Sequence, residues 1–441
     1  MNAEIRPAKT VAEIGLADLF AAARQRLPGG NEISALRLDA FDRFAAAGLP
    51  HSRLEAWKYT DLRRLVRDAK PLALVPDAAA RAAAGEAGAL LAGLGFRRLL
   101  IVNGAFIPEL SDLADLEPGL SIRSTAELLA ADEPLLSFGA AGADDDPALL
   151  LNTALAADGI VIAIAPSVVL DRPIHLVFIA TAGTPSAMFT RTRLDVGSGA
   201  RATLIETHEG PDRSDYQVNT ALQMVVGDEA HLDHLKITGE GNAALHIATL
   251  SANVGARASY REFGFTTGGS VVRNQLFVKL AGEGAVASVH QASLLAGRQH
   301  ADSTLVIDHG APGSQSREMF KAVVDDEARA VFQGKIMVQP GAQQTDAKMM
   351  ARALLLSDDA VMNCKPELEI FADDVQCGHG ATTGALDDQL KFYLMARGIP
   401  AKEAEALLIQ AFVGEIIDEV ERDDLREALS QVLMRWLQGR G

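Results

Sequence analysis

"VGSGARATL" (residues 196–204) recurs in altered form five times further along the chain, and this repeat decides the fold. Each copy has a small or acidic turn, then Ala, any residue and an apolar residue. The other copies are "VGDEAHLDH" (226–234), "VGARASYRE" (254–262), "AGEGAVASV" (281–289), "DDEARAVFQ" (325–333) and "SDDAVMNCK" (357–365). Their anchoring alanines lie 30, 26, 29, 43 and 32 residues apart, and we assign the long gap to an insertion, "HGAPGSQSREMF"; the anchors are Ala200, Ala230, Ala256, Ala285, Ala328 and Ala360.

A period near 30 residues with β-branched alternation is typical of a solenoid, because a single coil cannot bury its apolar face until others stack on it. We therefore expect the anchoring alanines to occupy equivalent places in stacked coils. An ordinary β-sandwich, with a turn signal about every ten residues, is the alternative interpretation.

The repeat region is flanked by segments of different texture. Residues 1–95 have helical periodicity and begin with a Thr10-x-x-Glu13 capping box. Residues 96–157 are mixed and contain a hairpin-like "FRRLLIVNGAFIPEL" with Asn-Gly at its turn. The β core spans 158–384, and residues 385–441 form amphipathic helices. These helices would either cap an open end of the solenoid or form a docking surface.

Composition excludes several classes of protein. The 441 residues carry a formal charge of −17, which disfavours nucleic acid and anionic lipid as partners. Two cysteines exclude a disulfide framework. The beginning, "MNAEIRPAKT", lacks an apolar signal region, and no apolar run is long enough to span a bilayer. We expect a soluble cytoplasmic protein.

Three Gly-x-Gly-x-x-Ala strings do not indicate a nucleotide site. They are "GSGARA" (197–202), "GEGNAA" (239–244) and "GEGAVA" (282–287), and strand-like alternation follows each one where a phosphate-binding helix is required. We interpret them as solenoid turns. No P-loop is present, because "FQGKI" lacks the first glycine.

Histidines and cysteines offer several candidate sites. His231 and His234 are three residues apart, so on a strand they point to opposite faces and do not share a metal. His290, His300 and His309 could line up across coils.

Cys377 and His379 are two residues apart and would share one face of a strand. Thiolate and imidazole suit zinc, copper or iron–sulfur species, although two ligands do not close a site. Cys364 is a possible third ligand. Alternatively, Cys377 is a small buried apolar residue and His379 belongs to a turn.

The stretch from Ser316 to Pro400 resembles the SufB/SufD family of iron–sulfur cluster scaffold components. Five strings carry the resemblance in order: "FQGKI", "GAQQTDA", "LLLSDDA", "KPELEIFADDV" and "CGHGATTG". "LEAWKYTDL" (54–62) is similar to the family's N-terminal Trp-x-Tyr-Thr element. The chain is most similar to the SufD branch, because the SufB branch is expected to carry more cysteines and a Glu where Gly380 follows the histidine.

The resemblance implies a mainly β fold, a right-handed parallel β-helix flanked by N-terminal and C-terminal helical domains. It also implies a non-catalytic scaffold that pairs with a SufB-type subunit and, through C-terminal helices within about 386–441, with a SufC-type ATPase. His379, with Cys377 in a less certain role, would contribute to a nascent iron–sulfur cluster at the interface with the SufB-type subunit. The isolated chain would hold no cofactor and would form a homodimer.

Two other classes of protein remain open. One is a β-helix enzyme that acts on carbohydrate or transfers acyl groups; a secreted lyase would carry a signal peptide, and an acyltransferase would show hexapeptide periodicity. The other is a purely structural scaffold that binds the ATPase without touching metal, and it predicts that Cys377 and His379 are dispensable.

Overall fold

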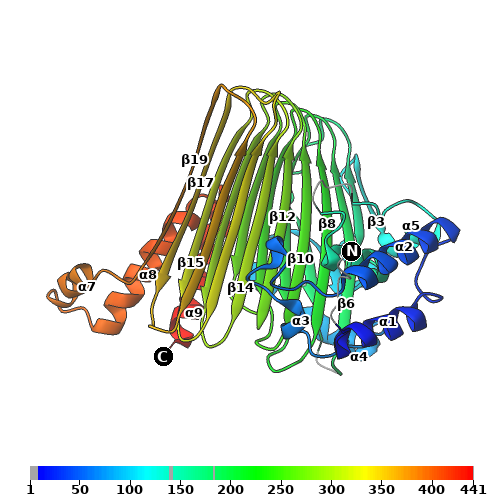
Figure 1. The fold of residues 1–441 in the computed structure, drawn as a ribbon, viewed down its shortest axis with the longest axis horizontal. Helices are drawn as coiled ribbons and strands as arrows, with labels where there is room; N and C mark the ends of the chain where they lie inside the picture. The colour runs from blue at the N-terminus through cyan, green and yellow to red at the C-terminus, as the bar shows by residue number, and fades with distance from the viewer. Residues whose placement is uncertain (1–7, 139–142, 182–183, 441) are drawn as a thin grey trace, which may run out of the picture.

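The protein, described by a computed structural model over residues 8–138, 143–181 and 184–440, is a β-helix built from two long sheets (Figure 1). We call them sheet A, with strand order β18-β16-β14-β12-β10-β8-β6-β4-β3, and sheet B, with order β19-β17-β15-β13-β11-β9-β7-β5-β1-β2. The chain alternates between the sheets, so two successive strands make one coil, and neighbours from β4 to β19 pair in parallel. The predicted parallel β-helix is confirmed, and the sandwich is excluded.

From β6 onward the strands are about ten residues long, which gives these coils a similar width. The strands of sheet A are β3 (Leu120–Ser124), β4 (Ile160–Ile164), β6 (Ala187–Val196), β8 (Gln217–Val226), β10 (Leu245–Val254), β12 (Val271–Leu280), β14 (His300–His309), β16 (Arg329–Val338) and β18 (Val361–Ile370). Those of sheet B are β1 (Arg97–Val102), β2 (Ala105–Phe106), β5 (Ile174–Ile179), β7 (Arg201–Glu209), β9 (His231–Gly239), β11 (Ser259–Thr266), β13 (Val286–Leu295), β15 (Gln315–Val324), β17 (Thr345–Leu355) and β19 (Val375–Gly384).

The alanine repeat marks the corners of the coil, but not all six anchors are equivalent. Ala200, Ala230 and Ala285 each precede the first residue of a sheet B strand and are buried. The equivalent residue of the third copy is Ala258, because Ser259 pairs with His231; Ala256 lies two residues earlier in the turn. The prediction for Ala256 was therefore wrong by two residues.

Ala328 and Ala360 also depart from the expected equivalence. They precede β16 and β18, so they lie at the opposite corner of the coil, in sheet A. The gap of 43 residues comes from this change of corner. "HGAPGSQSREMF" is an ordinary turn leading into β15, with no insertion. Turns at both corners need small residues, so the two corners look alike in sequence.

Helices at the N-terminal end cover the outer face of sheet A. Apolar residues of α1, α2 and α6 pack together with Ala187, Phe189 and Ile247, which point outward from β6 and β10. The Thr10–Glu13 capping box begins α1 as predicted, and the Asn103-Gly104 turn joins β1 to antiparallel β2. The helices are α1 (Val11–Ala23), α2 (Asn31–Ala47), η1 (Glu55–Trp57), α3 (Leu62–Leu65), α4 (Ala78–Ala83), η2 (Ala84–Glu86), η3 (Ala89–Leu91), η4 (Pro108–Leu110), α5 (Thr125–Ala130) and α6 (Pro147–Leu155).

The C-terminal helices cover the outer face of sheet B and leave the end of the β-helix open. Their ranges are α7 (Asp388–Met395), α8 (Ala401–Ile417) and α9 (Asp423–Gly439). Residues such as Ile409 and Leu429 of α8 and α9 pack against Leu235, Phe263 and Leu294 of sheet B. Figure 1 shows α7 extending away from the strands beyond the β19 end. Of the two roles left open for these helices, capping is therefore excluded.

Candidate functional site at the open end of the beta-helix

The last coil, β18 and β19, is the edge of both sheets. Each strand is hydrogen-bonded to a neighbour on one side only, to β16 and to β17 respectively. Side chains that are buried in the preceding coils become half-buried or exposed here. An unpaired parallel edge presents free N–H and C=O groups, so this end is suited to pairing with another chain.

The two edge strands differ in how freely they can pair. The N–H groups of Val361 and Phe371 donate to the preceding coil, so alternation along β18 directs the N–H groups of even-numbered residues to the open edge. Pro366 occupies one such position and has no N–H to offer. On β17, the N–H of Asp346 donates to the Ser314 carbonyl of the preceding coil. Because Asp346 pairs with Gln376, the even-numbered N–H groups of β19 likewise point back toward β17. The odd-numbered N–H groups of β19 face the edge, and no proline interrupts them.

Cys377 and His379 lie on the inner face of β19, at the mouth of the β-helix. They pair with Ala347 and Met349, which are buried in the main core of the preceding coil. Cys377 packs against that core and is half-buried, whereas His379 is exposed because no further coil covers it. Sequence reasoning therefore correctly put both side chains on one face.

Cys364 also faces the interior of the last coil, from the opposite sheet. It pairs with Phe332, a core residue, and packs against the same core as Cys377. Among the described residues, the groups of three or more possible ligands close enough to hold one ion include none of Cys364, Cys377 and His379. The chain alone thus presents these groups without assembling them into a closed site.

Burial keeps both cysteines in the thiol form at neutral pH. It raises the pKa of Cys364, and it raises the pKa of Cys377, where a hydrogen bond from the Ala347 backbone opposes it and the nearby Asp346 carboxylate adds to it. A thiol must lose its proton before it binds a metal. A cation brought close by a partner would favour that loss.

The other histidines singled out in the sequence serve elsewhere. His234 points inward and contacts Glu206 at 2.7 Å, while His231 lies on the other face, as expected. The hypothesis that His290, His300 and His309 line up across coils is wrong, because His290 pairs with Phe263 and Met319 in sheet B and the other two stand at opposite ends of β14.

A cavity of about 490 Å³ lies apart from this end of the β-helix. It lies between the outer face of sheet B and the link from α8 to α9. His231, Asp233 and Glu421 bring possible ligand atoms together there, but Arg261 already pairs with Glu421. This cavity shares no lining residue with the last coil.

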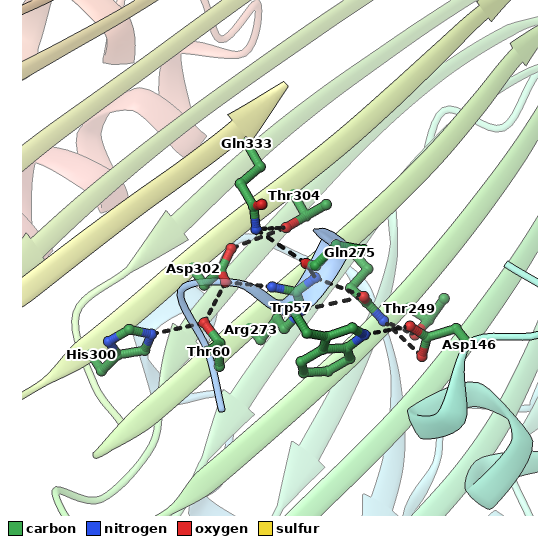
Figure 2. Close-up of polar contacts among 11 residues, drawn as sticks. Trp57, Thr60, Asp146, Thr249, Arg273, Gln275, His300, Asp302, Thr304 and Gln333 are labelled. Carbon is green, nitrogen blue, oxygen red and sulfur yellow. Dashed lines mark hydrogen bonds and ion pairs between the residues drawn. The ribbon is translucent and has the colours of Figure 1, made fainter. Parts of the chain in front are cut away.

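A buried polar network explains the Trp-x-Tyr-Thr element near the N-terminus. Thr249, Gln275, Thr304 and Gln333 form one row across the outer face of sheet A. Figure 2 shows the N-terminal segment lying over these strands, with Trp57 and its neighbours directed at them.

Arg273 is the centre of this network. It is fully buried, pairs with Asp302, lies 3.9 Å from the Trp57 ring and donates to the Ala56 carbonyl at 2.7 Å. Thr60 donates to Asp302 as well (Figure 2). The element therefore clamps the N-terminal helices to sheet A, a role that its sequence alone did not reveal.

Comparisons with known proteins agree with this architecture. The family model described as "SUF system FeS cluster assembly, SufBD core domain" matches residues 178–412, and the model for the SufBD protein N-terminal region matches residues 11–176. An iron–sulfur cluster assembly SufBD family protein of Synechocystis sp. is 33% identical over 433 residues, 94% of each chain. The iron–sulfur cluster assembly protein SufD of Escherichia coli is 29% identical over 391 residues, 88% of each chain.

These matches cover nearly the whole chain, so the protein belongs to the SufBD family of the SUF system of iron–sulfur cluster assembly. Across residues 8–138, 143–181 and 184–440, no helix is long and apolar enough to cross a membrane.

Proposed function

We propose that the chain is a non-catalytic scaffold subunit on whose open end an iron–sulfur cluster is built jointly with a SufB-type partner. The observation that supports this most strongly is the position of His379. Its imidazole is exposed on the inner face of the last coil, beside a strand edge that is free to pair. A partner docked on this edge would face the imidazole directly.

The incomplete ligand set fits a shared site better than a site within one chain. His379 and Cys377 supply one imidazole and one thiol, and Cys364 reaches the same interior from sheet A. Too few ligands are held together to bind iron strongly in the isolated chain. Ligands from a partner would complete the set, and the cluster is the cargo of the complex.

The ATPase surface in this proposal is centred on α7. The apolar faces of α8 and α9 are already buried against sheet B. In α7, by contrast, Leu390 is 51% exposed, Phe392 72% and Tyr393 53%. A helix with such a face is suited to lie in a groove of another protein, and the SufC-type ATPase is the proposed partner.

The test is cluster content in the assembled complex. His379→Ala, co-expressed with the SufB-type and SufC-type subunits, should assemble normally but carry at least about tenfold less iron and sulfide after anaerobic reconstitution, because the cluster loses one of its ligands. Cys377→Ser should have a smaller effect, because the histidine is the more exposed of the two groups.

Gln376→Ala is the matched control. Gln376 is exposed on the same strand, but it points to the opposite face from Cys377. The purely structural scaffold would instead be supported if the His379→Ala complex assembled normally and carried a full cluster.

A further inference from the structure

Two imidazoles and a carboxylate meet inside the β-helix, far from its open end. His208 is the second-last residue of β7, Glu240 follows the end of β9, and His246 is the second residue of β10. They are 1%, 5% and 0% exposed. One possible ligand atom from each lies within 4.8 Å of the other two.

Four polar atoms in this cluster lack a hydrogen-bond partner in the described part of the chain. They are both ring nitrogens of His208, Oε2 of Glu240 and Nδ1 of His246. Glu240 Oε2 and His246 Nδ1 are 3.0 Å apart, so a protonated Glu240 could satisfy that pair alone. Such a pair would still leave His208 Nδ1 without a partner and His208 Nε2 with only Glu206 Oε2 at 3.4 Å, at a cost of about 1–3 kcal/mol for a buried polar group left unpaired. An ion at the centre would engage all three side chains at once.

Nearby charges fit a divalent cation. Glu206 Oε2 lies 3.4 Å from His208 Nε2, so a second carboxyl group borders the cluster. Lys236 Nζ lies 3.1 Å from His246 Nε2 and donates to Asn274 Oδ1 at 2.8 Å.

The backbone around Glu240 is held in place by its neighbours. The Gly269 N–H donates to the Glu240 carbonyl at 2.9 Å, and the Gly241 N–H donates to the Tyr216 hydroxyl at 3.2 Å. A Cβ on Gly241 would come within 2.0 Å of the Pro211 carbonyl oxygen, so the stacked turns fit only with glycine there. This rigidity aims the Glu240 carboxyl into the interior.

We propose that His208, Glu240 and His246 bind a divalent transition-metal ion inside the β-helix, separately from the site at its open end. Nitrogen and carboxylate ligands suit Zn²⁺, Fe²⁺ or Co²⁺ and disfavour the alkaline-earth ions. A four-coordinate ion with bonds of about 2.1 Å holds its ligand atoms about 3.4 Å apart. The site closes if His208 moves slightly inward and the Glu240–His246 pair, now 3.0 Å apart, separates slightly.

The test measures metal in the full-length chain, made without a histidine tag in medium supplemented with Co²⁺ or Zn²⁺. After purification in chelator-treated buffer, elemental analysis should find about one ion per chain. Glu240→Gln and His246→Gln should each lower that content at least about tenfold, because each removes a ligand. X-ray absorption of the unmodified protein should show imidazole scattering.

Two controls separate this site from others. His309→Gln alters a buried histidine that hydrogen-bonds Ser314 and Ser316, and it should keep the ion. The double variant Cys377→Ser/His379→Ala removes the open-end groups; it should also keep the ion, and its spectrum should contain no sulfur ligand. The proposal is overturned if the unmodified chain holds no stoichiometric ion, or if Glu240→Gln and His246→Gln bind as much as wild type. If those variants do not fold, a wild-type spectrum without imidazole scattering overturns it.

Discussion

At the scale of single residues, the most demanding contact is the ion pair of Arg273 and Asp302. Both side chains are fully buried, and the guanidinium also stacks on Trp57. Removing one member leaves the other charge buried without its partner, which costs about 3–5 kcal/mol.

Arg273→Ala should therefore lower the free energy of unfolding by about that amount and loosen the N-terminal helices. Urea denaturation followed by circular dichroism measures the first effect, and limited proteolysis the second. Arg257→Ala is the control, because the Arg257–Glu229 pair is exposed on both sides and its loss should change little. If both substitutions lowered the free energy of unfolding equally, Arg273 would not be what holds the N-terminal helices on sheet A.

Glu318 gives a prediction about pH. Burial raises its pKa to about 8 from an ordinary 4.5, and its two oxygens lack hydrogen-bond partners among the described residues. Between those values the folded chain keeps the proton and the unfolded chain loses it, so the stability of the wild type falls as pH rises through this window.

Glu318→Gln removes this penalty. Its free energy of unfolding should exceed that of the wild type by a margin that grows with pH, at a rate of at most about 1.4 kcal/mol per pH unit, and levels off above the folded value. Denaturation at several pH values measures the margin. The exposed Glu283→Gln serves as the control, and a constant margin across the range would show that Glu318 ionises normally.

Residue spacing predicted the pairing of Cys377 with His379 and missed the buried cluster for a physical reason. Cys377 and His379 are two apart, so one strand suffices to put them together. His208, Glu240 and His246 come together only because the coil length brings the end of β7 beneath the beginning of β10. No short sequence pattern shows that these three residues lie close together in space.

At the scale of elements, the turns at the corners of the coil restrict the size of their residues most strictly. The sequence indicated small residues at the turns, but it did not separate one corner from the other, so Ala328 was placed half a coil away from its true position. Gly282 shows why small residues are needed: a Cβ there would lie 1.9 Å from the Ala256 nitrogen in the turn of the preceding coil.

Gly282→Ala should thus force adjacent turns apart and destabilise the protein by about 1–3 kcal/mol or more. Gly341→Ala is a matched control in another turn, because a Cβ at Gly341 would meet nothing within 4 Å. That substitution should be neutral or slightly stabilising. Thermal unfolding of the two variants makes the comparison, and a neutral Gly282→Ala would contradict the close stacking of turns.

Helix α7 carries the prediction about the ATPase. Phe392→Ser should weaken association with the SufC-type subunit at least about tenfold, as expected for an exposed aromatic anchor, without changing stability. Leu407→Ser on α8, where the side chain is 44% exposed, is the control. Calorimetry of the two variants measures binding. Deleting 400–441 is a poorer test, because it would uncover the outer face of sheet B. If Phe392→Ser bound the SufC-type subunit with unchanged affinity, the docking surface would not lie on α7.

At the scale of the whole molecule, the β-helix is covered on both outer faces and open at one end. The N-terminal helices cover sheet A, the C-terminal helices cover sheet B, and β18 and β19 keep free edges. The repeat predicted the solenoid, because its period is a property of the whole core. It did not predict which face each group of helices would cover, since amphipathic helices fit either.

We expect the isolated chain to pair with itself through β19. Light scattering at micromolar concentration should report a dimer. Ala381→Pro removes an N–H that faces the open edge, so it should give a folded monomer, whereas Gln376→Ala should remain dimeric. A monomeric wild type, or a dimer that Ala381→Pro leaves intact, would contradict pairing at this edge.

The proposed cluster site is most directly tested by anaerobic reconstitution of the wild-type chain with and without the proposed SufB-type and SufC-type partners. Iron and acid-labile sulfide are measured on the same preparations, with the partners alone as the reference. We expect a full cluster only in the complete complex and almost none in either part. A stable cluster on the isolated chain, or on the partners without it, would contradict a site completed at the open end of the β-helix.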